Sequence, residues 1–159
     1  MKATNFYIWV VLCLLFIGIS GCTTNNIVDT NEELPQRNWS YVNRVKAIAE
    51  ITDPAKAYIL KFKLRHTSDY RYSNIFILVH MSGPGMKKVT RRYEYRLAES
   101  DGQWLGKGSG NLFTYTLPLF SSYHFPQAGK YTIEIEQNMR DNPLREVSDV
   151  GIVVAQPTK

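Results

Sequence analysis

The chain has 159 residues, with 19 Lys or Arg against 14 Asp or Glu, so its formal net charge is +5. This mildly basic balance lacks the strong positive charge that is typical of nucleic-acid binders. The two cysteines, Cys13 and Cys22, both lie near the N-terminus, which excludes a disulfide or a thiolate metal site in the rest of the chain.

The N-terminus has the pattern of a bacterial lipoprotein signal. A basic start at Lys2 is followed by the apolar run 6–19, two small residues and Cys22. The run is shorter than the roughly 20 residues that span a bilayer as a helix, and no Ala-x-Ala cleavage site is present. A lipoprotein is therefore favoured over a transmembrane anchor or an ordinary secretory signal. We predict that residues 1–21 are removed and that Cys22 is acylated, which is sufficient for stable anchoring.

The segment that follows the signal, residues 23–38, is polar and has no hydrophobic periodicity. This composition predicts a flexible tether with a reach of about 20–25 Å, and an ordered edge strand around Ile27 and Val28 is the less favoured alternative. Removing the first 21 of the 159 residues leaves 138 residues, enough for one domain. We assign residues 22–38 to the lipidated tether and residues 39–159 to the domain.

From Trp39 onward, hydrophobic residues recur mostly at every second position, as in strands with one buried face. Strands are expected at about 44–51, 57–66, 74–81, 88–97, 112–119, 130–137 and 149–155. The continuously apolar segment 74–81 predicts a strand buried on both faces. Frequent turn signals and the lack of an amphipathic helical pattern predict an all-β fold, an antiparallel β-sandwich of about seven or eight strands, immunoglobulin-like or jelly-roll-like.

The turn before the strand at 130–137 allows two interpretations. Ala128-Gly129-Lys130-Tyr131 is typical of a sandwich corner in which a tyrosine hydroxyl binds the backbone. It fits equally well a plain turn that is followed by a core tyrosine.

No segment carries a catalytic or cofactor-binding pattern. The glycine-rich segment 106–110 has the wrong spacing for a phosphate-binding loop, so it is interpreted as a flexible or tightly turned connection. The histidines at 66, 80 and 124 lack metal-ligand spacing, and His80, inside an apolar strand, is expected to be a hydrogen-bonded core residue. Glu134 and Glu136 most simply belong to a solvated sheet face, with a glycosidase pair as the open alternative. We predict no enzymatic activity, no cofactor and no metal.

Two segments combine aromatic and polar side chains as binding surfaces do. One is 69–74, with Tyr70, Tyr72 and Asn74, and the other is 103–107, with Trp104. Such side chains anchor protein interfaces and stack on sugars. The alternative, which we favour, is that Trp104 belongs to the core and that the tyrosines close one end of the sandwich.

Several segments together resemble one known family in their order and spacing. They are Arg65–Asn74, Leu97–Ala98 with Asp101–Gly108, Phe125–Pro126 with Gly129–Tyr131, Ile135–Arg140, and Leu144 with Val147–Gly151. This set, after a lipoprotein signal, resembles the gliding-motility lipoprotein GldH family of Bacteroidota. The resemblance implies a cell-envelope lipoprotein that takes part in gliding, is linked to the secretion of surface adhesins, and has no catalytic residues.

We therefore expect a non-enzymatic, membrane-anchored accessory of the gliding-motility and adhesin-secretion machinery. Its candidate interaction surface consists of Tyr70, Tyr72, Asn74, Trp104 and Arg140. The expected partners are the membrane, through the lipid on Cys22, and proteins of the machinery, but no nucleic acid. An envelope glycan-binding module is the alternative function.

The residues after Cys22 also bear on where the lipoprotein is anchored. Thr23 stands where an aspartate would retain some lipoproteins in the inner membrane, so the outer membrane is favoured. No acidic cluster follows the cysteine, which favours the periplasmic face over the cell surface.

Overall fold

The computed structural model describes residues 25–157. The predicted signal, Cys22 and the first residues of the predicted tether lie outside this range. The described residues form twelve strands and one short 3-10 turn, η1 (Pro35–Arg37), and contain no α-helix. Within the same range, no helix is long and apolar enough to cross a membrane.

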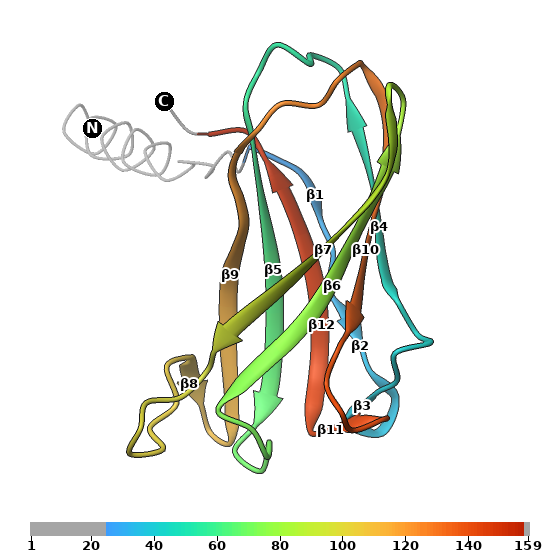
Figure 1. Ribbon diagram of the computed structural model, residues 1–159. Helices are drawn as coiled ribbons and strands as arrows, with labels where there is room; N and C mark the ends of the chain where they lie inside the picture. Colours follow the sequence, from blue (N-terminus) through green and yellow to red (C-terminus); the bar gives the residue numbers. More distant parts are fainter. Residues whose placement is uncertain (1–24, 158–159) are drawn as a thin grey trace, which may run out of the picture.

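Two antiparallel sheets pack face to face (Figure 1). The larger sheet has the order β1-β12-β5-β9-β8, with β2 also paired to β12, and the smaller has the order β4-β10-β6-β7. A ribbon of β11 and β3 lies at one end (Figure 1). The strands are β1 (Asn26–Asp29), β2 (Glu32–Glu33), β3 (Asn38–Trp39), β4 (Val45–Ile51), β5 (Tyr58–Thr67), β6 (Asn74–Gly83), β7 (Met86–Arg96), β8 (Lys107–Ser109), β9 (Leu112–Tyr123), β10 (Gly129–Gln137), β11 (Leu144–Arg145) and β12 (Val147–Ala155).

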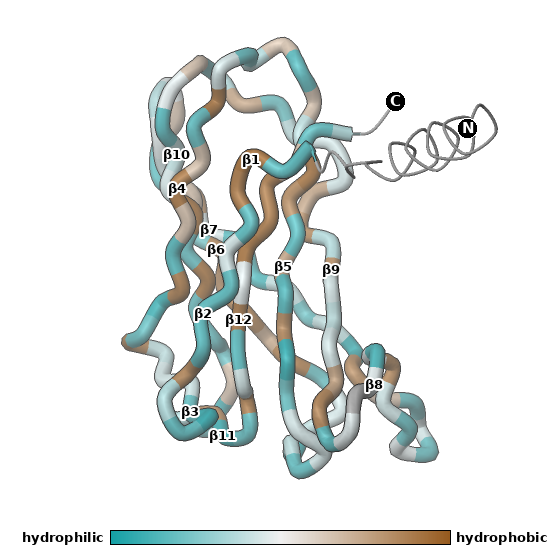
Figure 2. Tube along the Cα trace, turned by 180° about the vertical axis from the view of Figure 1, so that it is seen from behind, coloured by the Kyte–Doolittle hydropathy of each residue, from teal (hydrophilic) through white to brown (hydrophobic). Residues whose placement is uncertain are grey.

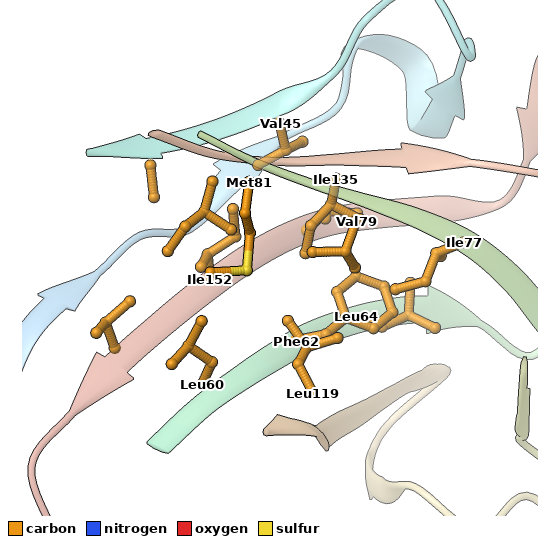
Figure 3. Close-up of a cluster of buried hydrophobic side chains, with 14 of the residues drawn as sticks. Val45, Leu60, Phe62, Leu64, Ile77, Val79, Met81, Leu119, Ile135 and Ile152 are labelled. Atoms are coloured by element: carbon orange, nitrogen blue, oxygen red, sulfur yellow. The ribbon is translucent and has the colours of Figure 1, made fainter. Parts of the chain in front are cut away.

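The predicted β-sandwich is confirmed. Its seven long strands, β4, β5, β6, β7, β9, β10 and β12, coincide with the seven segments expected from the hydrophobic alternation. Their inward side chains, such as Phe62, Ile77 and Ile152, meet between the sheets (Figure 3). The strand at 74–81 is not buried on both faces as expected, because the outer face of the smaller sheet has no covering layer and leaves Phe76 and Leu78 half-buried.

The prediction of a flexible tether is wrong for residues 26–38, which belong to the sandwich. β1 pairs with β12, the Thr30 N–H donates to the Ile152 carbonyl at 2.9 Å, and the Leu34 N–H donates to the Ser148 carbonyl at 2.9 Å. Backbone hydrogen bonds hold this edge segment, so most of its side chains need not be apolar and no periodicity marks it. In Figure 2, β1 lies along β12.

The glycine-rich segment is also more regular than expected. Lys107–Ser109 forms the short strand β8, which pairs with β9. Gly110, with φ of 63°, takes the turn between the two strands. This left-handed conformation is one that glycine adopts without steric cost. The segment is therefore one arm of a tightly turned hairpin, so the tight-turn alternative holds and the flexible one does not.

The Tyr131 hydroxyl closes a corner, which decides between the two interpretations of that turn. Its oxygen lies 2.7 Å from the Pro84 carbonyl and 2.9 Å from the Gln127 carbonyl, and it accepts the Gln127 N–H at 3.1 Å. Because the hydroxyl has one proton, it donates to one carbonyl at a time. The contact back to a backbone four residues upstream is that of a tyrosine corner.

Replacing Tyr131 with phenylalanine is expected to lower the free energy of unfolding by about 1–2 kcal/mol, because buried partners of the hydroxyl lose their hydrogen bond. Denaturant unfolding monitored by circular dichroism measures the change. The matched control is Tyr123→Phe, since the Tyr123 hydroxyl makes no hydrogen bond within the part of the chain that the structure describes, and its effect should stay within about 0.5 kcal/mol. Equal effects of the two substitutions would contradict the corner assignment.

Candidate functional site

All five residues of the predicted interaction surface lie at one end of the sandwich. The described chain begins at the other end of the sandwich, at Asn25, and it also ends there, because the Gln156 N–H donates to the Asn25 carbonyl. We call the end where Asn25 and Gln156 lie the proximal end. The loops 68–73, 97–106 and 138–143 lie at the opposite end, which we call the distal end (Figure 1). β5, with ten residues, runs between the two ends and spans about 33 Å. Figure 2 shows the distal loops mostly in hydrophilic colours.

Two of the five residues are part of an aromatic cluster, in which Tyr70, His66 and Tyr115 are buried and Trp104 and Phe113 are half-buried. The His66 ring centroid lies 4.4 Å from that of Trp104 and 4.8 Å from that of Tyr70. Tyr70 is only 4% exposed and its hydroxyl donates to the Asn74 carbonyl at 3.1 Å. Tyr70 therefore closes the end of the sandwich, as the favoured alternative stated, and is covered too well to stack on a sugar. Trp104 packs against the core from its edge and stays half-buried.

His66 lies fully buried at the centre of the cluster. Its Nδ1 is 2.8 Å from the Thr67 carbonyl, to which it donates, so the neutral ring carries its proton there. Nε2 faces the Tyr115 hydroxyl at 3.2 Å, while that hydroxyl donates to the Leu97 carbonyl at 2.7 Å. Burial lowers the pKa of His66, and the bond to Thr67 offsets only part of this effect. The period-two pattern of β5 was the sequence signal that places His66 on the inner face.

The stability of the fold is expected to decrease as the pH falls below about 6.5. The lowered pKa of His66 in the folded state means that the unfolded chain binds a proton first, so unfolding is favoured as the pH falls through the ordinary histidine pKa. Thermal unfolding between pH 7.5 and pH 5 measures this. His66→Gln removes the titrating group and should flatten the dependence, whatever its effect on stability at pH 7.5. An unchanged dependence in that variant would contradict the assignment.

Beside the aromatic cluster, the distal surface contains two adjoining open hollows of about 740 and 710 Å³. They share Arg71, Tyr72, Arg140 and Asp141. The second hollow contains the other three predicted residues, and we call it the arginine groove. The side chains that define it are Arg71, Tyr72, Asn74, Phe76, Arg92 and Arg140.

Hydrogen bonds from Gln137 and Tyr72 fix the position of the loop that carries Arg140. The buried Gln137, 1% exposed, donates from Nε2 to the Asp141 carbonyl at 3.1 Å and accepts the Met139 N–H at 2.8 Å. The Tyr72 hydroxyl donates to Asp141 Oδ2 at 2.6 Å, and this hydrogen bond raises the pKa of Tyr72. These contacts join the loop 138–141 to the loop that carries Arg71.

Arg92 enters the groove from the outer face of β7. Its guanidinium carbon lies 4.0 Å from the Phe76 ring centroid, and its Nε donates to Asn138 Oδ1 at 2.9 Å. The register of β6 and β7, which pairs Leu78 with Arg92, brings it there. The pairing register of two strands cannot be read from the sequence of either strand alone. For this reason the sequence did not indicate Arg92 as part of a site.

Comparison with known proteins agrees with the extent of this domain. The family model described as GldH lipoprotein matches residues 26–154. The chain belongs to the GldH lipoprotein family. The match begins at the first residue of β1, which supports the inclusion of that segment in the domain.

Two relatives of this GldH-family chain cover nearly its whole length. The gliding motility lipoprotein GldH homolog of Christiangramia forsetii is 30% identical over 157 residues, with 94% of each chain covered. The gliding motility lipoprotein GldH of Flavobacterium johnsoniae is 27% identical over 154 residues, covering 92% of this chain and 94% of its own. The family resemblance deduced from the ordered segments is thus confirmed.

The outer face of the smaller sheet carries an arrangement that resembles a catalytic relay. His80 Nδ1 lies 2.8 Å from the Thr90 hydroxyl, and Nε2 lies 3.2 Å from Glu136 Oε2. β6, which carries His80, is paired on both sides, so its backbone N–H groups are engaged in the sheet rather than directed at a reacting oxygen. His80 is thus buried and hydrogen-bonded as predicted, but the prediction of a core position is wrong, because its side chain lies on the outer face of the smaller sheet, opposite Val79 and Met81.

The other chemical alternatives concern carboxylates. Glu134 and Glu136 both pair with Arg44, at 3.8 and 2.7 Å. Because the two carboxylates share the Arg44 guanidinium on an open sheet face, they fit a structural ion-pair network better than a glycosidase pair. Among the described residues, no three His, Cys, Asp or Glu side chains are close enough together to hold a metal ion.

Proposed function

We propose that this GldH-family lipoprotein is a non-enzymatic accessory of the gliding-motility and adhesin-secretion machinery, and that its distal end contacts a protein partner. The relatives are named for gliding motility. The observation that carries the proposal is that the arginine groove and the described N-terminus lie at opposite ends of the sandwich (Figure 1).

The position of the anchor supports this orientation. Asn25 follows Cys22 by three positions, so the chain between them extends over at most about 11 Å. With Cys22 acylated, the proximal end is kept next to the membrane. The distal end then projects by roughly the length of β5, about 33 Å. We place the anchor in the outer membrane, on its periplasmic face, because Thr23 follows Cys22 and no acidic cluster does.

The experiment is deletion of the gene in its own host, if that host glides, or otherwise of the relative's gene in Flavobacterium johnsoniae. We expect reduced colony spreading and reduced export of surface adhesins. Cross-linking and affinity purification of a C-terminally tagged protein from intact membranes then identifies the partner. Normal spreading together with normal adhesin export in the deletion strain would contradict the proposal.

A further inference from the structure

We propose that the arginine groove binds an acidic polypeptide segment, a short run of Asp or Glu residues in the partner. The inference rests on the proposed function, since it names the chemistry of the partner that the distal end meets. Its experiment is a direct binding measurement, so its failure can be distinguished from a failure of the cellular role.

The charges of the groove are the first argument. Arg71, Arg92 and Arg140 line the groove with a single carboxylate, Asp141, which accepts the Tyr72 hydroxyl. Within the described part of the chain, Arg71 and Arg140 make no ion pair, and the nearby Glu94 carboxylate accepts a hydrogen bond from Asn74. Guanidinium groups gathered in this way suit carboxylates, which they bind through two parallel hydrogen bonds.

The rigidity of the groove is the second argument. Arg92 is oriented by its stacking on Phe76 and by its bond to Asn138, so that its terminal amino groups remain available. Gln137 and the Tyr72–Asp141 bond hold the loop of Arg140. A site that is already ordered loses less conformational freedom on binding, which raises affinity without additional contacts.

The location and lining of the groove favour a polypeptide over other anions. The nearest part of the groove, at Phe76, is separated from the proximal end of β6 at Gly83 by most of that strand, roughly 20 Å, so the head groups around a lipid on Cys22 are out of reach. The Phe76 ring is covered by Arg92, so that ring offers no free face for a sugar. Asn138 and Met139 add amide and apolar surface, as an extended peptide requires. The neighbouring hollow is excluded because Asp69, Asp141 and Glu146 balance its arginines.

The experiment measures binding of a fluorescein-labelled decaglutamate peptide to the mature, lipidated protein in nanodiscs of neutral phosphatidylcholine. We expect saturable binding that weakens with salt. The double variant Arg71→Gln/Arg140→Gln should bind at least tenfold more weakly. The matched control, Lys87→Gln/Lys130→Gln, removes the same charge at the proximal end and should change affinity less than twofold. Circular dichroism and melting temperature verify that each variant is folded.

Four other outcomes would overturn the inference. An equal loss in both double variants would mean that net charge alone attracts the peptide. Stronger competition by polygalacturonate than by unlabelled decaglutamate would indicate an acidic glycan, and competition by millimolar inorganic phosphate would indicate a simple anion site. No binding even at low salt would exclude an acidic segment.

A different result would separate this inference from the proposed function. If the Arg71→Gln/Arg140→Gln variant fails to bind the peptide but supports normal gliding, the peptide site exists and the proposed role of the distal end in gliding is refuted.

Discussion

Replacing Cys22 with alanine is expected to release the protein from the membrane completely and to abolish its function in gliding, while the fold remains intact. The fold should remain intact because the described sandwich begins at residue 25 and none of its described contacts involves Cys22. Each buried methylene of an acyl chain contributes about 0.8 kcal/mol to membrane binding, and loss of the thioether removes all the chains at once. Without the acyl chains, the distal end should no longer be kept at a fixed distance from the membrane.

Membrane fractionation, metabolic labelling with a fatty-acid analogue and colony spreading measure these effects. Cys13→Ala is the matched control, because it makes the same change inside the apolar run of the predicted signal and should leave acylation unaffected. A Cys22→Ala protein that remains in the membrane fraction would contradict the predicted signal. A soluble variant that supports normal gliding would show that the anchor is dispensable.

Replacing Gly151 with alanine is expected to lower the free energy of unfolding by about 3 kcal/mol. A Cβ at this position would lie 2.1 Å from the Thr30 carbonyl oxygen and 2.7 Å from the Lys63 side chain. The lysine can move, but the carbonyl belongs to the segment that is bonded to Ile152 through the Thr30 N–H. The clash is therefore relieved only by displacing that segment from β12.

Chemical denaturation measures the loss, and amide hydrogen exchange over residues 26–33 shows whether that segment is displaced. Gly108→Ala in β8 is the control, because its Cβ would meet only the edge of the Phe113 ring, at 3.3 Å, and its effect should stay within about 0.5 kcal/mol. If residues 26–38 were a tether in solution, Gly151→Ala would cost little stability and their amides would exchange rapidly in the wild-type protein.

The long strands were predictable because each has its own hydrophobic alternation. β5 alternates Leu60, Phe62 and Leu64 with Lys61 and Lys63, and this pattern requires one buried face wherever the strand lies. β1 and β2 lack such a pattern because backbone bonds to β12 hold them. β8 was missed for a related reason, since three residues beside a glycine turn carry almost no periodicity.

The candidate site was predicted in part. The sequence indicated Tyr72, Asn74 and Arg140, and all three line the arginine groove. It also indicated Tyr70 and Trp104, which come from separate segments and meet inside the molecule around His66. Residue type identifies side chains that are suited to binding, but exposure depends on which neighbours cover them. That information is distributed over strands that are distant in sequence.

The sequence by itself determined the class of the protein: the lipoprotein signal, the antiparallel sandwich and the family all follow from local patterns and their order along the chain. Only the tertiary structure decided that β1 and β2 pair with β12, that Tyr70 is interior, and that Arg71, Arg92 and Arg140 come together at the end opposite Asn25. The physical reason is that alternation and turn residues act within a few positions. Register, docking and the convergence of charges depend on contacts between strands that the local pattern does not encode.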